Sequence, residues 1–335
     1  MFYKGYNYGS QANYNPFFVT INSSSDILQL TNRNNDLRSY DLRAGMRNVN
    51  WNLERAFYVI DRYGWDRFIK TELVPTTLKA TGVQYWPNYK LHLIGGGMSY
   101  VATAEWFEYH GIGYPRVNSL ITMAAMHYLN EIVENNRYSG PNVDPLADLL
   151  IFDPLGIVLF SIDGVPEFFA NRLNMADWSF QPMYNPATYQ LLNNGQKFSF
   201  KIPVPFYQRL KFFYLTGIEG MAGATYALTE TDDFTVSSGM AAHELDEVDN
   251  NTGVRTLYSK LIWTHGIFYD RNNSLLASLI LGGPRGYRAR LNLYPGVLKY
   301  RSFSPGLAFL LQENNNLVFG IFLRYLPVGG AFSIH

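Results

Sequence analysis

Four polar residues between positions 127 and 134 have the types and the spacing for chemistry. His127, Asn130, Glu131 and Glu134 follow at i, i+3, i+4 and i+7, so on a helix all four side chains lie along one stripe. An imidazole beside two carboxylates can act as a general base with an orienting partner, or bind a divalent metal. The stripe can also simply hydrogen-bond to polar neighbours, because buried polar groups need partners. We favour this structural role and expect no cofactor and no metal.

A second group of carboxylates follows the stripe. Asp144 and Asp148 have i, i+4 spacing, and Asp153 precedes Pro154. Paired carboxylates occur in metal and glycosidase sites. An aspartate directly before a proline is also typical of a helix start. We therefore interpret Asp144 as a helix N-cap and Asp153 as the start of a further turn.

The element that carries the stripe is predicted to be an amphipathic helix. Apolar residues recur at helical spacing between Arg116 and Asn136, with Pro115 as a start signal. Together with the aspartate segment, this predicts a helical insert at about 115–160.

The first part of the chain has a different pattern. Residues 1–48 are rich in Asn, Tyr, Ser and Gly and are predicted to form an extended arm. Residues 50–73 place aromatic and aliphatic side chains at mostly helical spacing, which predicts an amphipathic helix. We therefore divide the chain into an arm and helix over 1–75 and a β-barrel with its helical insert over 76–335.

Period-two alternation predicts strands in the rest of the chain. Residues 85–93 and 98–106 alternate on either side of Gly95-Gly96-Gly97, which predicts a hairpin. Clearer alternation follows residue 176, where Phe198, Phe200 and Ile202 oppose Lys197, Ser199 and Lys201, and Ala289 and Leu291 oppose Arg288 and Arg290. We count roughly ten to twelve strands, mostly after residue 176.

Two architectures fit such strands. A soluble β-rich fold points the apolar face inward, whereas a transmembrane barrel points it at lipid. Strands of about ten residues, aromatic residues at their ends, and a charged fraction of only 16% favour the membrane form. We predict an all-β dominated chain, a transmembrane antiparallel barrel of roughly 10–12 strands with the helical insert in or under its lumen. Lys197, Lys201, Arg288 and Arg290 would then face the lumen and pair with the stripe.

Composition excludes several classes of protein. Lys+Arg and Asp+Glu number 27 each, so no basic footprint for nucleic acid exists, and without cysteine there are no disulfides or thiolate sites. No stretch has the length and apolarity of a transmembrane helix. Gly-x-Ser-x-Gly, His-Glu-x-x-His, Walker and dinucleotide motifs are missing. The N-terminus shows no signal-peptide pattern, so an exported protein would be a processed chain.

Several sequence blocks resemble uncharacterised outer-membrane barrel proteins of Bacteroidetes-type bacteria. The blocks are Tyr14-Asn15-Pro16, Ile21-Asn22, Asp26-Ile27-Leu28-Gln29, Pro87-Asn88-Tyr89, His92-Leu93-Ile94-Gly95-Gly96-Gly97, Asn130-Glu131, Asp148 and Phe152-Asp153-Pro154-Leu155-Gly156. The resemblance covers most of the chain and implies location and fold, but it carries over no catalytic residue. It departs at the end, where Leu326–His335 follows the last clear strand instead of a terminal aromatic.

These observations lead to one main functional expectation and two alternatives. We expect a non-enzymatic barrel of the cell outer membrane, plugged by its helix, that serves as a structural or accessory subunit of an envelope complex. Its partners would be the lipid bilayer and lipopolysaccharide, with other outer-membrane or periplasmic proteins, and no nucleic acid. The alternatives are a lipid or lipopolysaccharide hydrolase, with His127 as base and Glu131 or Glu134 as its partner, and a small-solute pore.

Overall fold

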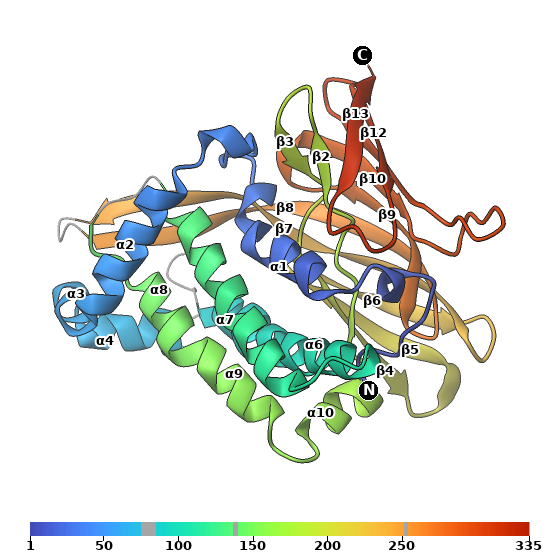
Figure 1. Ribbon diagram of the computed structural model, residues 1–335, viewed down its shortest axis with the longest axis horizontal. Helices are drawn as coiled ribbons and strands as arrows, with labels where there is room; N and C mark the ends of the chain where they lie inside the picture. Colours follow the sequence, from blue (N-terminus) through green and yellow to red (C-terminus); the bar gives the residue numbers. More distant parts are fainter. Residues whose placement is uncertain (75–84, 137–139, 251–253, 335) are drawn as a thin grey trace.

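The chain forms a helical layer packed on one face of a large twisted sheet (Figure 1). The computed structural model describes residues 1–74, 85–136, 140–250 and 254–334. In the described ranges, the helical layer extends to residue 172, and all the strands follow it. The predicted boundary at residues 75 and 76 lies outside the described residues.

The helical layer combines α-, π- and 3-10 helices. The α-helices are α1 (Pro16–Ser24), α2 (Leu42–Glu54), α3 (Ala56–Tyr63), α4 (Trp65–Phe68), α5 (Tyr85–Pro87), α6 (Gly97–Tyr109), α7 (Pro115–Glu134), α8 (Asp144–Ala147), α9 (Asp153–Phe160) and α10 (Val165–Glu167). The π-helical segments are η4 (Ile69–Leu73), η5 (Asn88–Gly96), η6 (Asp148–Phe152) and η7 (Phe168–Arg172). The 3-10 turns are η1 (Ser10–Ala12), η2 (Asp26–Gln29), η3 (Leu37–Ser39) and η8 (Pro284–Gly286).

The described strands number thirteen and join in one sheet. They are β1 (Ala176–Asp177), β2 (Met183–Asn185), β3 (Gln190–Leu192), β4 (Phe198–Val204), β5 (Tyr207–Thr216), β6 (Glu219–Ala227), β7 (Asp232–Asn250), β8 (Val254–Arg271), β9 (Ser274–Gly282), β10 (Tyr287–Leu293), β11 (Gly306–Gln312), β12 (Leu317–Phe322) and β13 (Gly329–Ile334). The predicted meander after residue 176 is confirmed.

The sheet is an antiparallel meander with one parallel pair. Its order is β1-β4-β5-β6-β7-β8-β9-β10-β11-β12-β13-β2-β3, and only β13 and β2 run parallel. Strands β1 and β3 stand at the two ends and do not pair with each other, so the described strands do not close into a ring. A large, mostly antiparallel sheet with helices is therefore established, while the closed barrel stays a prediction.

The hairpin predicted at residues 85–106 is wrong, because this segment is helical. Residues 85–109 form the consecutive helical segments α5, η5 and α6. The three glycines do not make a turn but allow close packing. A Cβ on Gly97 would lie 2.7 Å from the carbonyl oxygen of Gly156, and one on Gly95 would lie 2.4 Å from the Phe198 ring. Contacts with α9 and the sheet thus outweigh the short alternating pattern.

The extended arm predicted for residues 1–48 is also corrected. Asn15 caps α1 by accepting a hydrogen bond from the Phe18 amide, and Pro16 stands in the first turn. The buried Asn22 of α1 accepts from the Gly195 amide and donates to the Phe180 carbonyl. The segment therefore lies between the helical layer and the sheet and fills the interface, which a solvated arm would not do.

The helices predicted at 50–73 and at about 116–136 are confirmed, and the first is broken into several segments. The first comprises the end of α2 together with α3, α4 and η4, and the second is α7. Buried side chains of α1, α6, α7 and α9 pack with Phe198 and Phe322 of the sheet. A separate aromatic core of Trp178, Phe213 and Phe268 covers the inner face of the sheet.

No single described helix has the length and hydropathy of a membrane span. One bent pair, Asp144–Phe160 with Val165–Arg172, meets that test together across an 87° bend.

Candidate functional site

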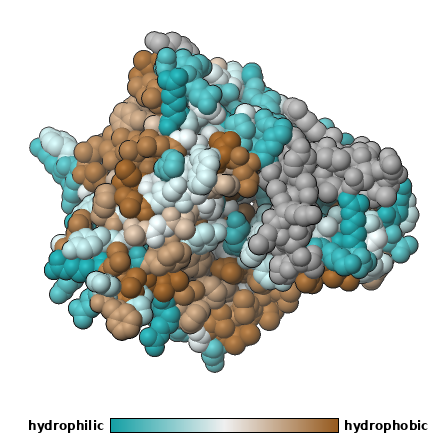
Figure 2. Space-filling model, turned by 180° about the vertical axis from the view of Figure 1, so that it is seen from behind, coloured by the Kyte–Doolittle hydropathy of each residue, from teal (hydrophilic) through white to brown (hydrophobic). Residues whose placement is uncertain are grey.

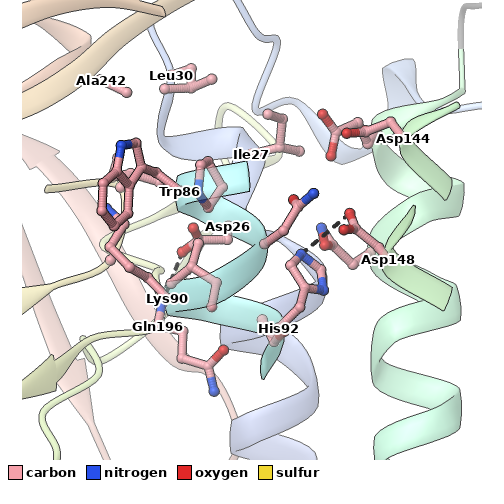
Figure 3. A pocket seen from close by; sticks show the side chains of 18 of the residues that line it. Asp26, Ile27, Leu30, Trp86, Lys90, His92, Asp144, Asp148, Gln196 and Ala242 are labelled. Atoms are coloured by element: carbon pink, nitrogen blue, oxygen red, sulfur yellow. Dashed lines mark hydrogen bonds and ion pairs between the residues drawn. The ribbon is translucent and has the colours of Figure 1, made fainter. Parts of the chain in front are cut away.

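A cavity of about 600 Å³ lies between the helical layer and the sheet. Part of its wall is apolar, with Ile27, Leu30 and Trp86. His92 and Asp148 form a polar wall on the helical side of the cavity, and a dashed line joins them in Figure 3. Asp144 lies one helical turn before Asp148. The cavity is therefore amphiphilic.

All four residues of the predicted stripe lie on α7 and face this region. His127 and Glu131 are buried, whereas Asn130 and Glu134 are less buried and line the cavity. The helical spacing thus predicted their shared face correctly.

His127 belongs to a cluster with residues of two other segments, which we call the His–Asp cluster. It comprises His92 from η5, His127 from α7 and Asp153 from α9. Oδ1 of Asp153 lies 2.9 Å from Nδ1 of His92 and 3.1 Å from Nδ1 of His127. On its other side, Nε2 of His92 lies 3.4 Å from Oδ2 of Asp148. The two imidazoles therefore converge on one carboxylate oxygen.

Glycines bring these three segments close together. A Cβ on Gly156, three residues after Asp153, would lie 2.9 Å from the carbonyl oxygen of His92. A Cβ on Gly96 would lie 3.2 Å from Nε2 of His127. Because Gly156 and Gly96 have no side chains, α9 can approach η5 and the His127 ring can lie close to the backbone of Gly96.

Two of the polar residues stand on π-helical turns. His92 lies within η5 and Asp148 begins η6. A π-turn widens the helix by one residue and changes the direction of the side chains that follow, and such turns are frequent at functional sites. The sequence contains no simple signal for them, so residues 85–93 were predicted as a strand and Gly95–Gly97 as a turn.

A group of three carboxylates adjoins the His–Asp cluster, and we call it the acidic group. Glu131, Asp144 and Asp148 each offer an oxygen within 4.8 Å of the others. Burial raises the pKa of Glu131 and of Asp148 well above the ordinary range, and the neighbouring carboxylates, Asp144 first, raise both further. Burial, with Asp144 nearby, also raises the pKa of Glu72 to about 8. Glu72 therefore retains its proton at neutral pH, and the raised pKa values of Glu131 and Asp148 favour their neutral forms.

The two histidines of the cluster differ in charge. Burial lowers the pKa of His127 to about 4, and Asp153 opposes only part of this shift. Burial also acts to lower the pKa of His92, but Asp153 more than compensates and the pKa rises to about 9. At neutral pH, His92 carries a proton on both nitrogens and His127 is neutral. Such a divergence is typical of acid–base sites.

The predicted N-cap role of Asp144 is wrong, whereas α9 does begin at Asp153 as predicted. The cap position of α8 is Val143, and Asp144 stands within the first turn without a side-chain capping bond. Asp153 continues directly from the helical Phe152. Their carboxylates instead face the acidic group and the His–Asp cluster. Sequence analysis missed His92 and Asp153 as site residues, because they meet His127 only through long-range packing.

The predicted basic residues form a separate set of contacts, which we call the sheet network. Lys197 and Arg290 both pair with Glu219, the latter at 3.0 Å. Lys201 lies 3.0 Å from Asp233 and 2.6 Å from Asp270. All these groups are buried on the inner face of the sheet. The predicted pairing of the stripe with basic strand residues is therefore replaced by pairing within the sheet.

Arg288 does not join the sheet network. A register shift between Tyr287 and Ala289 at the start of β10 places Tyr287 in the interior. Arg288 is exposed and donates to Asn315. A bulge of this kind reverses the alternation on which the prediction depended.

No protein family model matches the chain, and comparisons with curated proteins and with solved structures gave no match either. The resemblance to outer-membrane barrel proteins of Bacteroidetes-type bacteria therefore stays a prediction.

Proposed function

We propose that the protein is inserted in an outer membrane through the outward face of its sheet, as a non-enzymatic structural or accessory subunit of an envelope assembly. One observation carries the proposal, a row of apolar residues that crosses ten neighbouring strands from β4 to β13. In register, it is Ile202, Phe212, Ala224, Val236, Ile267, Leu279, Leu291, Phe309, Phe319 and Phe332. We call it the apolar row.

The apolar row lies on the outside of the molecule. None of its members is buried, and Val236 is 47% and Phe332 57% exposed. Seen from behind, hydrophobic surface gathers over much of the side opposite to that of Figure 1 (Figure 2). Isolated exposed apolar residues are normal in soluble proteins, but a continuous row across a sheet marks contact with lipid or protein.

The opposite face of the sheet carries buried charged and polar groups beside its aromatic core. It buries the charged groups of the sheet network and polar residues such as Thr235, Thr264 and Ser278. A membrane sheet alternates apolar-out with polar-in, whereas a soluble sheet alternates in the opposite sense. Strands β5, β6 and β9 have 10, 9 and 9 residues, close to the length of a tilted membrane strand.

The helical layer supports a role as a subunit. Val117, Leu120 and Ile121 on α7 and Leu155 and Val158 on α9 are exposed. Apolar helix surface of this extent requires cover. A neighbouring protein of the envelope would supply it, while the bilayer, with lipopolysaccharide, covers the sheet.

The experiment that tests membrane insertion uses the exported full-length chain. After alkaline carbonate treatment, we expect the protein to stay in the outer-membrane fraction, to require detergent, and to migrate faster on gels when unheated. Release by carbonate as a detergent-free monomer would contradict the proposal. Release as a complex with a second protein would show that the apolar row contacts that protein instead of lipid.

The cavity favours a second candidate function, hydrolysis of a lipid or lipopolysaccharide. His127 is neutral and therefore able to accept a proton, and its oriented partner is Asp153 instead of the predicted Glu131 or Glu134. Turnover of membrane lipid that His127→Gln abolishes and His265→Gln, at an exposed position of β8, preserves would replace the accessory role. A pore has less support, because Trp178, Phe213 and Phe268 fill the inner face of the sheet.

A further inference from the structure

We propose that the His–Asp cluster binds one divalent transition-metal ion through Nδ1 of His92, Nδ1 of His127 and a carboxylate oxygen of Asp153. This inference is independent of membrane insertion, because it depends only on the helical layer.

The spacing of the three ligands fits a metal ion. The Asp153 oxygen lies 2.9 Å and 3.1 Å from the two imidazole nitrogens. Atoms bound to one ion at about 2.0–2.2 Å lie roughly 3 Å apart when they subtend a right angle at the metal. Three donors from three different segments therefore already stand near the distances of a coordination shell.

Unsatisfied polar atoms point into the same place. Nδ1 of His127 and Oδ2 of Asp153 lack a hydrogen-bond partner within the described part of the chain, although their side chains are only 6% and 8% exposed. Buried polar atoms without partners are rare and call for an explanation, such as an ion. A metal would accept the lone pair of the neutral His127 and would neutralise Asp153.

The surroundings orient the ligands as in known metal sites. Asp148 lies 3.4 Å from Nε2 of His92, so it can accept the remaining ring proton when Nδ1 binds the metal. This carboxylate–histidine–metal arrangement fixes the tautomer and strengthens the ligand. The backbone at Gly96 supports the Nε2 edge of His127 and directs its other nitrogen toward Asp153.

The donor types select the class of metal. Two imidazole nitrogens with one carboxylate suit zinc, iron, cobalt or manganese, whereas magnesium and calcium prefer oxygen ligands alone.

The test measures metal binding by the purified full-length protein in detergent. The chelator-treated chain is titrated with Zn²⁺ and, separately, with Co²⁺, and excess ion is removed by gel filtration. We expect about one ion per chain for the wild type and a visible Co²⁺ spectrum. His127→Gln and Asp153→Asn should lower the affinity for Zn²⁺ at least tenfold and abolish the Co²⁺ spectrum.

Two matched controls separate the site from adventitious binding and from misfolding. His265→Gln removes an exposed histidine of β8 and should bind like the wild type. Asp148→Asn keeps all three ligands and should weaken binding by about 10- to 100-fold while the stoichiometry at saturation stays the same. Less than a tenth of an equivalent in the wild type, or equal retention by His127→Gln and His265→Gln, would overturn the proposal.

Discussion

The sheet network and the helical side of the cavity both bury carboxylates, but they compensate the charge in opposite ways. In the sheet, Glu219, Asp233 and Asp270 each face a lysine or arginine. In the helical layer, Glu131, Asp148 and Asp153 form no ion pair with lysine or arginine among the described residues. They face histidines and one another.

This difference separates a structural role from a binding role. A buried carboxylate with a basic partner is satisfied within the protein, and its removal mainly affects stability. Crowded carboxylates without such partners raise one another's pKa values and leave room for an external cation. Substitutions in the two regions should therefore have opposite effects, and the following predictions test that contrast.

The largest effect is expected in the sheet network. Lys201→Met should destabilise the protein by about 3–5 kcal/mol, because it leaves Asp270 buried without a basic partner and Asp233 with Lys211 alone. Denaturant unfolding in detergent measures the change. The exposed pair of Lys70 and Asp66 provides the control, and Lys70→Met should cost less than about 1 kcal/mol. Equal costs would show that the sheet network is solvated.

The next effect concerns the apolar row on the outside of the same strands. Val236→Arg should cost about 2–4 kcal/mol if this position lies near the middle of a bilayer. Glu230→Arg, in the exposed turn before β7, should change stability by about 0.5 kcal/mol or less. Insertion into the membrane and unfolding free energy are the two measurements. If both variants behave alike, the outward face contacts water.

A smaller effect of opposite sign is expected in the acidic group. In metal-free protein at pH 7, Glu131→Gln should increase stability, because burial and the neighbouring carboxylates favour a proton on Glu131 in the folded protein that the unfolded chain releases. Because the pKa of Glu131 is raised in the folded protein, Glu131 destabilises the fold increasingly as the pH rises above the ordinary pKa of glutamate. The gain should therefore vanish near pH 4. A loss of stability at pH 7 would show that Glu131 makes a stabilising contact in the folded protein.

Asp26 links the two regions and should give the smallest effect. Burial raises its pKa to about 6, although Lys197 of the sheet network opposes the shift. A raised pKa for an acid means that stability is lost as pH rises, here between about 4 and 6. Because Asp26 is partly exposed at the cavity, we expect roughly 1 kcal/mol. Asp26→Asn should remove this dependence in pH-resolved unfolding curves.

Local periodicity in the sequence was sufficient for several elements. Pro115 and the apolar spacing that follows it predicted α7, because helix starts and helical faces depend on residues within a few positions. Helical spacing likewise predicted the shared face of His127, Asn130, Glu131 and Glu134, and period-two alternation predicted the strands after residue 176. It also predicted that Ile202 and Leu291 would share a face, which the register confirms.

The tertiary structure alone decided the conformation of residues 85–109 and the composition of the site. The short alternation around Gly95–Gly97 is compatible with a strand, but these glycines gain close contacts with α9 and the sheet only in a helix. His92, His127 and Asp153 meet because Gly156 lets α9 approach η5. Lys197, just before β4, Lys201 of β4 and Arg290 of β10 pair with acidic residues of β6, β7 and β8, and strand register determines these pairings. Such contacts depend on packing between distant segments, which periodicity within one segment does not encode.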